Sequence, residues 1–503
     1  MPSRHIEGKI GAHDRHQFEL KLGYQLDPSL SKNKYNMELY MFIPKSLGIN
    51  RATYAKRHFF GDIQSYIRFK TPFFTFDSLV DPSNKLSPLT RIKAVFNTTK
   101  DKKKLITELK LYACTVRVAL RNSIIQMRKN IRKNETAPLK KDLNAACTGL
   151  TKCLDALRAL QQSLWGPDVH EDVRTAYRHA DEYIGIVSDG LLNSFHNTII
   201  ASNLDTNLAN ELSSIIKPLI ISEFRHRSQL GYATYALGSE NEQFLYRKSM
   251  LKKIITNILF LETHTLEGLT IAKDIIFAAA AGIAMIIFVV VSFWAGQKWR
   301  TTSMPFALAL VLAYIVKDRF KDWFKIIFSR KMTRWFSDYK TNITDPATDT
   351  KIGICKHAFS FISEKNVPAD ILDMRRHNTP PDFWPQEETI KYEKDVLLKP
   401  RPILKTHRRL HDITDIVRFN VHQFLDRMDE SYEIKRAIDP ETFETKEFKC
   451  ARTYHVNIIL KLENEIHRFR LVLNQNGIKR IEEVPHPTLS IKDAGDTESL
   501  HFG

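Results

Sequence analysis

Cysteine is scarce in this sequence of 503 residues, and its five copies follow no recognisable spacing. Their number is odd and no CxxC pair is present, so neither a disulfide framework nor a zinc knuckle is indicated. A reducing compartment therefore fits the sequence best. The cysteines are Cys114, Cys147, Cys153, Cys355 and Cys450.

Several familiar sequence signals are also missing. The first residues, MPSRHIEGKIGAHDRHQ, contain no apolar run, so we expect no cleavable secretory signal and a cytoplasmic region before the first membrane span. No Gly-rich phosphate loop, GxSxG elbow or HExxH pair occurs, which leaves the commonest motif-bearing enzyme classes without support. The absence of these linear motifs does not exclude an enzyme of another class. The sequence contains no repeat and no low-complexity tract.

Positive charge is in excess. The chain has 75 lysines and arginines against 57 aspartates and glutamates, a formal net charge of +18. This surplus favours an anionic neighbour, either phospholipid headgroups or nucleic acid, although a basic solvated surface has the same composition. Arg468 and Arg470 alternate with Phe469 and Leu471 as on an RNA-binding sheet, but any half-exposed strand alternates in this way. Nucleic acid is thus a possible partner that no motif supports.

The N-terminal region, residues 1–85, has the alternation of half-buried strands. Apolar side chains occupy every second position from Phe18 to Tyr24 and again from Met37 to Ile43. This period of two predicts a small N-terminal β-sheet.

Residues 86–270 change to a helical period. Apolar side chains recur every three or four positions over residues 102–131, 143–164 and 169–195, and the second stripe has the spacing of a coiled-coil seam. Further helical stretches follow, with interruptions expected near Pro218 and Gly238. We predict a bundle of long helices.

The C-terminal region, residues 346–485, is predicted as an α+β domain. Apolar spacing predicts a helix over residues 413–428. Strict alternation over residues 454–462 and 469–473, with turn residues between and after them, predicts an antiparallel β-meander. The last residues, 486–503, have no periodicity and are expected to form a flexible tail.

Two apolar segments in residues 271–318 predict a transmembrane hairpin. Residues 275–295 form a run of 21 residues without charge, which matches the roughly 20 residues that cross a hydrocarbon core. The second segment, residues 304–316, has only 13 uncharged residues and crosses if Lys317 and Arg319 extend to the interface. We therefore expect two spans.

A basic amphipathic helix is expected to lie at the membrane interface over residues 319–345. Its apolar face recurs at helical spacing, and basic residues such as Lys317 and Arg319 occupy other faces, where they would meet anionic headgroups. Trp294 and Trp299 fit an interfacial aromatic belt. The apolar face consists of Phe320, Trp323, Phe324, Ile327 and Phe328.

Basic residues near the spans predict the orientation. Residues 296–303, between the spans, contain two basic residues, whereas seven follow the second span within residues 317–334. Because lysine and arginine favour the inner side, both large domains should be cytoplasmic, in a bacterial inner membrane.

Small residues recur at four-residue spacing in the first span, which lets helices approach closely within the hairpin or between copies. A transporter needs polar groups at membrane depth, and the spans offer only two serines near their ends. Packing is therefore the preferred interpretation of the small residues, which are Ala278, Gly282, Ala280 and Ala284.

One group could hold a metal ion. His407 and His411 are four residues apart on an expected helix, with Asp412 beside them. Among 18 histidines such a spacing arises readily by chance, so a basic surface helix is preferred and no cofactor is expected.

Together these patterns predict a multidomain α+β membrane protein, with an N-terminal sheet, a helix bundle, a transmembrane hairpin and a C-terminal α+β domain with a β-meander. The absent motifs favour a membrane-anchored cytosolic interaction or regulatory protein, partnered by an anionic bilayer and by a protein, or a second copy, at the bundle. The alternative is a membrane-tethered, hydrolase-like enzyme, possibly metal-dependent, acting on nucleic acid or phospholipid, with His407, His411 and Asp412 as its centre.

Overall fold

The structure, a computed structural model, has a mixed α+β fold and divides into two compact units. The β unit contains residues 1–68, 261–406 and 412–503, and the helical unit contains residues 69–260 and 407–411. The chain is described except for residues 1–5, 237, 268–269, 301–302, 333–336, 378–386, 408, 410–411 and 486–503.

Two sheets form the body of the β unit. The smaller sheet has the strand order β1-β2-β9-β4 and the larger has the order β14-β13-β12-β3-β8-β7-β6-β5. Neighbouring strands of the larger sheet are antiparallel throughout. The strands of the smaller sheet are β1 (Ile6–Ala12), β2 (Gln17–Tyr24), β4 (Ile63–Phe69) and β9 (Ile413–Asn420). Those of the larger sheet are β3 (Asn33–Pro44), β5 (Glu262–Glu267), β6 (Tyr339–Asp345), β7 (Thr350–Ile362), β8 (Glu387–Leu398), β12 (Tyr454–Leu462), β13 (Glu465–Asn474) and β14 (Gly477–Glu483).

The predicted strands are confirmed. Alternate residues of β2 are buried, from Phe18 to Tyr24, because one face of the sheet meets the core. The meander is β12, β13 and β14, and Gly477 adopts a φ of +121° at its second turn.

Strands from both ends of the chain are neighbours. β3 pairs with β12 on one side and with β8 on the other, and β2 pairs with β1 and β9. Residues 1–85 and 346–485, which the sequence patterns separate, thus contribute to the same two sheets. Alternation identifies the buried face of a strand, but it carries no information on which strand lies beside it.

The helix predicted over residues 413–428 is wrong. Residues 413–420 form β9, and only the short α14 (His422–Leu425) follows. The apolar spacing is compatible with a helix, but the segment ITDIV is rich in β-branched residues, which favour a strand.

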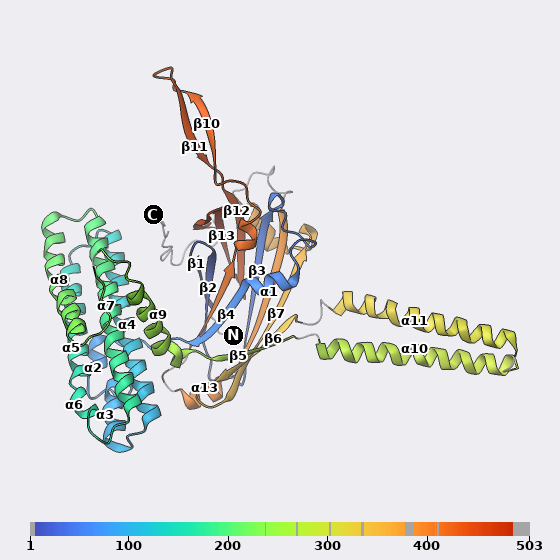
Figure 1. Cartoon of the computed structure of the whole chain (residues 1–503), viewed down its shortest axis with the longest axis horizontal. Coiled ribbons are helices and arrows are strands. Elements are labelled where there is room, and N and C mark those ends of the chain that lie inside the picture. Colours follow the sequence, from blue (N-terminus) through green and yellow to red (C-terminus); the bar gives the residue numbers. More distant parts are fainter. Residues whose placement is uncertain are drawn as a thin grey trace. The chain divides into compact units, whose positions relative to one another are not determined.

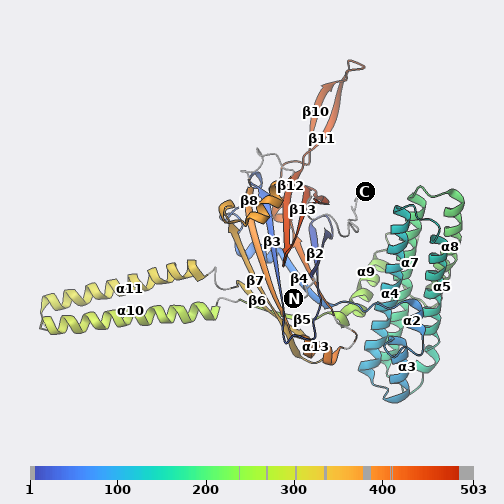
Figure 2. The ribbon, with the colours of Figure 1, turned by 180° about the vertical axis from the view of Figure 1, so that it is seen from behind.

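Short helices accompany the β unit. They are η1 (Lys45–Leu47), α1 (Lys56–Asp62), η3 (Glu364–Asn366), α12 (Ala369–Arg376) and α13 (Pro400–Thr406). Strands β10 (Tyr432–Ile438) and β11 (Thr445–Ala451) pair only with each other and form a two-stranded ribbon (Figure 2).

The helical unit is a bundle in which α4, α5, α7 and α8 run side by side (Figure 1). The predicted stripes are confirmed, since the apolar residues of α4 and α5 are buried. Pro218 lies inside α8 and does not end it, so the interruption expected there is wrong, whereas the one expected near Gly238 lies between α8 and α9. The helices are α2 (Phe76–Val80), α3 (Pro88–Thr98), α4 (Lys102–Arg132), α5 (Leu139–Arg158), α6 (Gln161–Leu164), α7 (Glu171–Ala201), α8 (Thr206–Gln229), α9 (Glu242–Thr256) and η2 (Asn257–Leu259).

Two further long helices, α10 (Thr270–Lys298) and α11 (Met304–Met332), follow β5 and precede β6 along the chain. They pack against each other (Figure 1). The interfacial helix expected over residues 319–345 is the second half of α11 rather than a separate helix. Its expected range also includes β6, a strand of the larger sheet.

Candidate membrane anchor and binding site

Within the described part of the chain, one helix is long and apolar enough to cross a membrane. This stretch is Phe277–Lys298 of α10, and most of its residues are not buried. α11 does not qualify, because charged residues follow its uncharged segment from Lys317 onward. The expected pair of spans is therefore not confirmed by composition.

The distribution of small and large apolar side chains on α10 and α11 is the reverse of that in a water-soluble helical hairpin. Alanines lie buried between the helices, with Ala280, Ala284 and Ala295 at most 1% exposed. Large apolar side chains point outward along both helices. Those at least half exposed are Met285, Ile286, Val290, Phe293, Trp294, Met304, Leu308, Val311, Leu312, Tyr314, Ile315, Val316 and Trp323. Small residues inside and large apolar residues outside are typical of helices packed in lipid.

The two small-residue pairs have different surroundings. Ala280 and Ala284 face α11, whereas Ala278 and Gly282 are exposed, and a Cβ added to Gly282 would meet nothing within 4 Å. Of the two pairs, only Ala280 and Ala284 therefore lie at the contact between α10 and α11.

The predicted interface residues near the loop between the helices form a cluster. The rings of Trp294 and Trp299 lie 5.7 Å apart in a T-shaped arrangement, and Lys298 Nζ is 5.1 Å from the Trp294 ring centroid. Amphipathic aromatic rings with a nearby cation suit a lipid–water boundary.

At the other end of the uncharged segment, Lys317 Nζ lies 4.0 Å from the centroid of the Tyr314 ring and 5.8 Å from that of Phe288 on α10. Arg319 is exposed and Phe320 is half-buried. The side chains of Phe324, Ile327 and Phe328 lie outside the described residues, so the apolar face predicted for them is untested.

The β unit contains a cavity of about 340 Å³ with a mixed apolar and polar lining. Alternate residues of five strands line it, because residues two apart on a strand point to the same face. α1 completes the wall with Arg57, Phe60 and Gly61. The strand residues are Ile63, Ser65 and Ile67 of β4, Thr263 and Thr265 of β5, Tyr339 and Thr341 of β6, Cys355 and His357 of β7, and Tyr392 and Lys394 of β8.

A buried ion pair lies in the wall of this cavity. Lys394 Nζ is 2.5 Å from Asp415 Oδ2, and both side chains are fully buried. Lys394 also donates to Ser65 Oγ at 2.9 Å, and the Asp415 carboxylate accepts hydrogen bonds from Ser65 and Tyr24. A buried charge needs this degree of compensation, since desolvating each ion costs several kcal/mol, of order 5 or more.

His357 lies in a second chain of hydrogen bonds. Its Nδ1 is 2.8 Å from Tyr392 OH and its Nε2 is 3.1 Å from Thr341 Oγ1, which in turn contacts Thr265 Oγ1 at 2.9 Å. Burial lowers the pKa of His357 to about 3, and the charge of Lys394 adds to this effect. The imidazole is therefore neutral at pH 7.

These protonation states favour binding over acid–base catalysis. Burial by itself lowers the pKa of Lys394, but Asp415 outweighs it and raises the pKa overall, so Lys394 stays protonated and cannot serve as a base for Ser65. Burial raises the pKa of Cys355 to about 12, which keeps it a thiol rather than a nucleophilic thiolate. The cavity presents hydroxyl groups, one thiol and one neutral imidazole, and both nitrogens of this imidazole are already engaged by Tyr392 and Thr341.

The group proposed for a metal ion, His407, His411 and Asp412, is untested as a whole, because one of its members is not described. No group of three or more His, Cys, Asp or Glu side chains in the described part of the chain could hold a metal ion. The His407 ring contacts the Phe69 ring in a tilted arrangement, with centroids 4.7 Å apart, and Arg409 pairs with Glu108. His411 lies outside the described residues.

Sequence reasoning missed the cavity residues, although a signal existed. In the strand EETIKYEKDVLL, Lys394 occupies the same phase as the buried Ile390, Tyr392, Val396 and Leu398. A lysine in the apolar phase of a strand indicates a compensated buried charge.

The comparisons with known proteins name no relative: no protein-family model, no curated protein and no solved structure matches this chain.

Proposed function

We propose that this protein is a membrane-anchored interaction or regulatory protein. α10 and α11 cross the bilayer as a hairpin and hold both units on the cytoplasmic face. The cavity of the β unit then binds a small polar ligand at the membrane surface.

The observation that carries this proposal is the place of the hairpin in the chain. It is inserted between β5 and β6, which are antiparallel neighbours, with Glu267 directly opposite Tyr339. The chain thus leaves the sheet and returns to it at the same point, so the inserted segment must end on the side of the membrane where it began. If α10 crosses, α11 must cross back.

The short uncharged segment of α11 is compatible with this return. Residues 304–316 extend about 20 Å as a helix, less than the hydrocarbon thickness of about 30 Å. Lys317, packed over the Tyr314 ring, and Arg319 extend the span by reaching toward anionic headgroups. The alanine contacts with α10 compensate for the weaker apolar character of α11.

A deletion tests the anchor without disturbing the sheet. Residues 270–332 are replaced by a short Gly/Ser linker, which joins two strands that already pair. The full chain should remain in the membrane pellet after alkaline carbonate extraction, and the deletion variant should be soluble and folded.

The ribbon of β10 and β11 provides a matched control, because this segment also begins and ends at residues that pair with each other, Tyr432 and Ala451. Replacing residues 433–450 by the same linker should leave the protein in the membrane. A full chain that is soluble without detergent, or a deletion variant that stays in the membrane, would contradict the proposal.

A further inference from the structure

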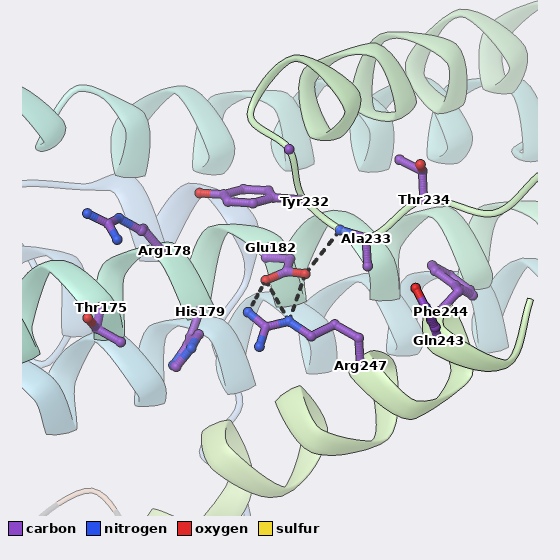
Figure 3. Close-up of a pocket in the computed structure, with 11 residues that line it drawn as sticks. Thr175, Arg178, His179, Glu182, Tyr232, Ala233, Thr234, Gln243, Phe244 and Arg247 are labelled. Carbon is purple, nitrogen blue, oxygen red and sulfur yellow. Dashed lines mark hydrogen bonds and ion pairs between the residues drawn. The ribbon is translucent and has the colours of Figure 1, made fainter.

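A cavity of about 570 Å³ in the helical unit has charged groups that are matched within that unit (Figure 3). Its buried carboxylate, Glu182, accepts hydrogen bonds from Arg247, with Nη2 at 2.6 Å, and from Ala233 N at 3.3 Å. The guanidinium of Arg178 lies 5.6 Å from the centroid of the Trp165 ring. Arg247 and Glu182 thus neutralise each other, and the described lining of this cavity does not call for a charged ligand.

The ribbon of β10 and β11, in contrast, has two strand edges that no other described strand covers. Its strands pair in a continuous register, from Tyr432 opposite Ala451 to Ile438 opposite Thr445. Every residue of both strands is exposed except Cys450, which is half-buried. An isolated two-stranded ribbon is marginally stable in water, and its edges offer unpaired N–H and C=O groups to a further strand. A third strand along one of these edges would therefore stabilise the ribbon.

Symmetry limits how a second copy of the ribbon could supply that strand. In an antiparallel pair, residues directly opposite each other point to the same face of the sheet. Two identical antiparallel strands related by a twofold axis can therefore meet only in a register centred on one residue, which lies opposite its own copy. β10 and β11 each have seven residues, so the whole strand pairs only when the central residue is the fourth.

The fourth residue of β11 is Phe448, and the register centred on it is self-complementary. Glu447 of each copy lies opposite Lys449 of the other, and Phe448, 48% exposed in the single chain, lies opposite its own copy. Opposite charges and aromatic pairs at directly opposed positions stabilise antiparallel sheets. Moving the centre by one residue in either direction would place two glutamates or two lysines opposite each other. The charges of β11 thus favour the one register that uses its full length.

The other edge of the ribbon opposes a second copy. The fourth residue of β10 is Lys435, so the same symmetry places two lysines opposite each other at the centre. Lysine on an exposed edge strand is a common means by which proteins prevent edge-to-edge pairing. One edge of the ribbon therefore accepts a copy and the other rejects it, which limits the association to two chains.

We propose that two copies of this protein associate through β11, so that their ribbons form one four-stranded antiparallel sheet with the two β11 strands at its centre. Glu447 keeps its ion pair with Arg436 of its own chain, at 2.6 Å, and Lys449 of the second copy lies on its other side. Charges of alternating sign then cross the sheet. This association does not rest on the membrane anchor, because a soluble chain would have the same strand edge.

Complementary charge reversals test this pairing in the full chain, with the mass measured by analytical ultracentrifugation in detergent. The wild type should be a dimer. Glu447→Lys alone places lysines opposite lysines, and Lys449→Glu alone places glutamates opposite glutamates, so each should raise the dimer dissociation constant about tenfold or more. An equimolar mixture of the two variants should recover the dimer, because opposite charges then face each other again. Lys435→Glu, on the other edge of the ribbon, is the matched control and should stay dimeric.

A cross-link at the centre of the sheet gives a second measurement that leaves the charges of β11 unchanged. In a Cys450→Ser background, Phe448→Cys places two thiols on Cβ atoms about 5 Å apart, whereas Lys435→Cys places them three strand spacings apart, about 14 Å. The four other native cysteines are buried. A short bismaleimide should link two chains of the first variant and not of the second. A wild type that is monomeric at every concentration, charge variants that dimerise as tightly as the wild type, or equal cross-linking at the two positions would overturn the proposal.

Discussion

At the scale of single residues, the buried pair of Lys394 and Asp415 is the most consequential contact of the β unit. Lys394→Met leaves the carboxylate of Asp415 buried without its countercharge, which typically costs about 3–5 kcal/mol of unfolding free energy. Urea unfolding of the full chain in detergent should show this loss. Lys356→Met, at an exposed position of β7, should leave the midpoint almost unchanged. Equal midpoints for the two variants would mean that the pair contributes nothing to stability.

His357 predicts a pH dependence. Its pKa is lowered to about 3 in the folded protein, against roughly 6.5 when unfolded. The unfolded chain therefore binds the extra proton between these values, so stability falls as pH decreases from about 6.5 toward 3, by an amount of the order of a few kcal/mol. His357→Gln should flatten the change in urea midpoint between pH 7 and pH 5. His264→Gln, at an exposed position of β5, should keep the wild-type slope; a wild-type slope in His357→Gln would refute the assignment.

At the scale of elements, the contact between α10 and α11 depends on alanine. Ala280→Leu overpacks the seam, and such changes cost about 1–3 kcal/mol in well-packed interiors. In nanodiscs, amide hydrogen exchange of residues 304–316 should accelerate in this variant. Ala278→Leu adds the same side chain two residues away at an exposed position and should leave exchange unchanged. Similar exchange in both variants would show that the helices do not pack through this face.

The sequence predicts elements better than it predicts their neighbours. Alternation locates β2 and β3, and the stripe of α4 locates its buried face, because both signals are local. The position of β3 between β12 and β8 joins residues more than 300 apart, which no local period records. The cavity residues were missed for the same reason, since Ser65 of β4 and Lys394 of β8 are 329 residues apart.

At the scale of the whole molecule, the proposed anchor would explain the exposed apolar surface of α10 and α11. Apolar side chains that would destabilise a water-exposed hairpin become favourable when they face lipid. In the proposed topology, the seven lysines and arginines within residues 317–334 are the feature that would keep both units inside. This account makes the loop between the helices the one part that reaches the far side.

Cysteine accessibility at this loop tests the account most directly. In a Cys450→Ser background, Gln297→Cys places a thiol at an exposed position near the loop, and Ser239→Cys places one on the helical unit. The four other native cysteines are buried. With a membrane-impermeant maleimide added outside intact spheroplasts, the account predicts labelling of Gln297→Cys, and labelling of Ser239→Cys only after permeabilisation. A Gln297→Cys variant that stays unlabelled until the membrane is opened would contradict the crossing of α10 and α11.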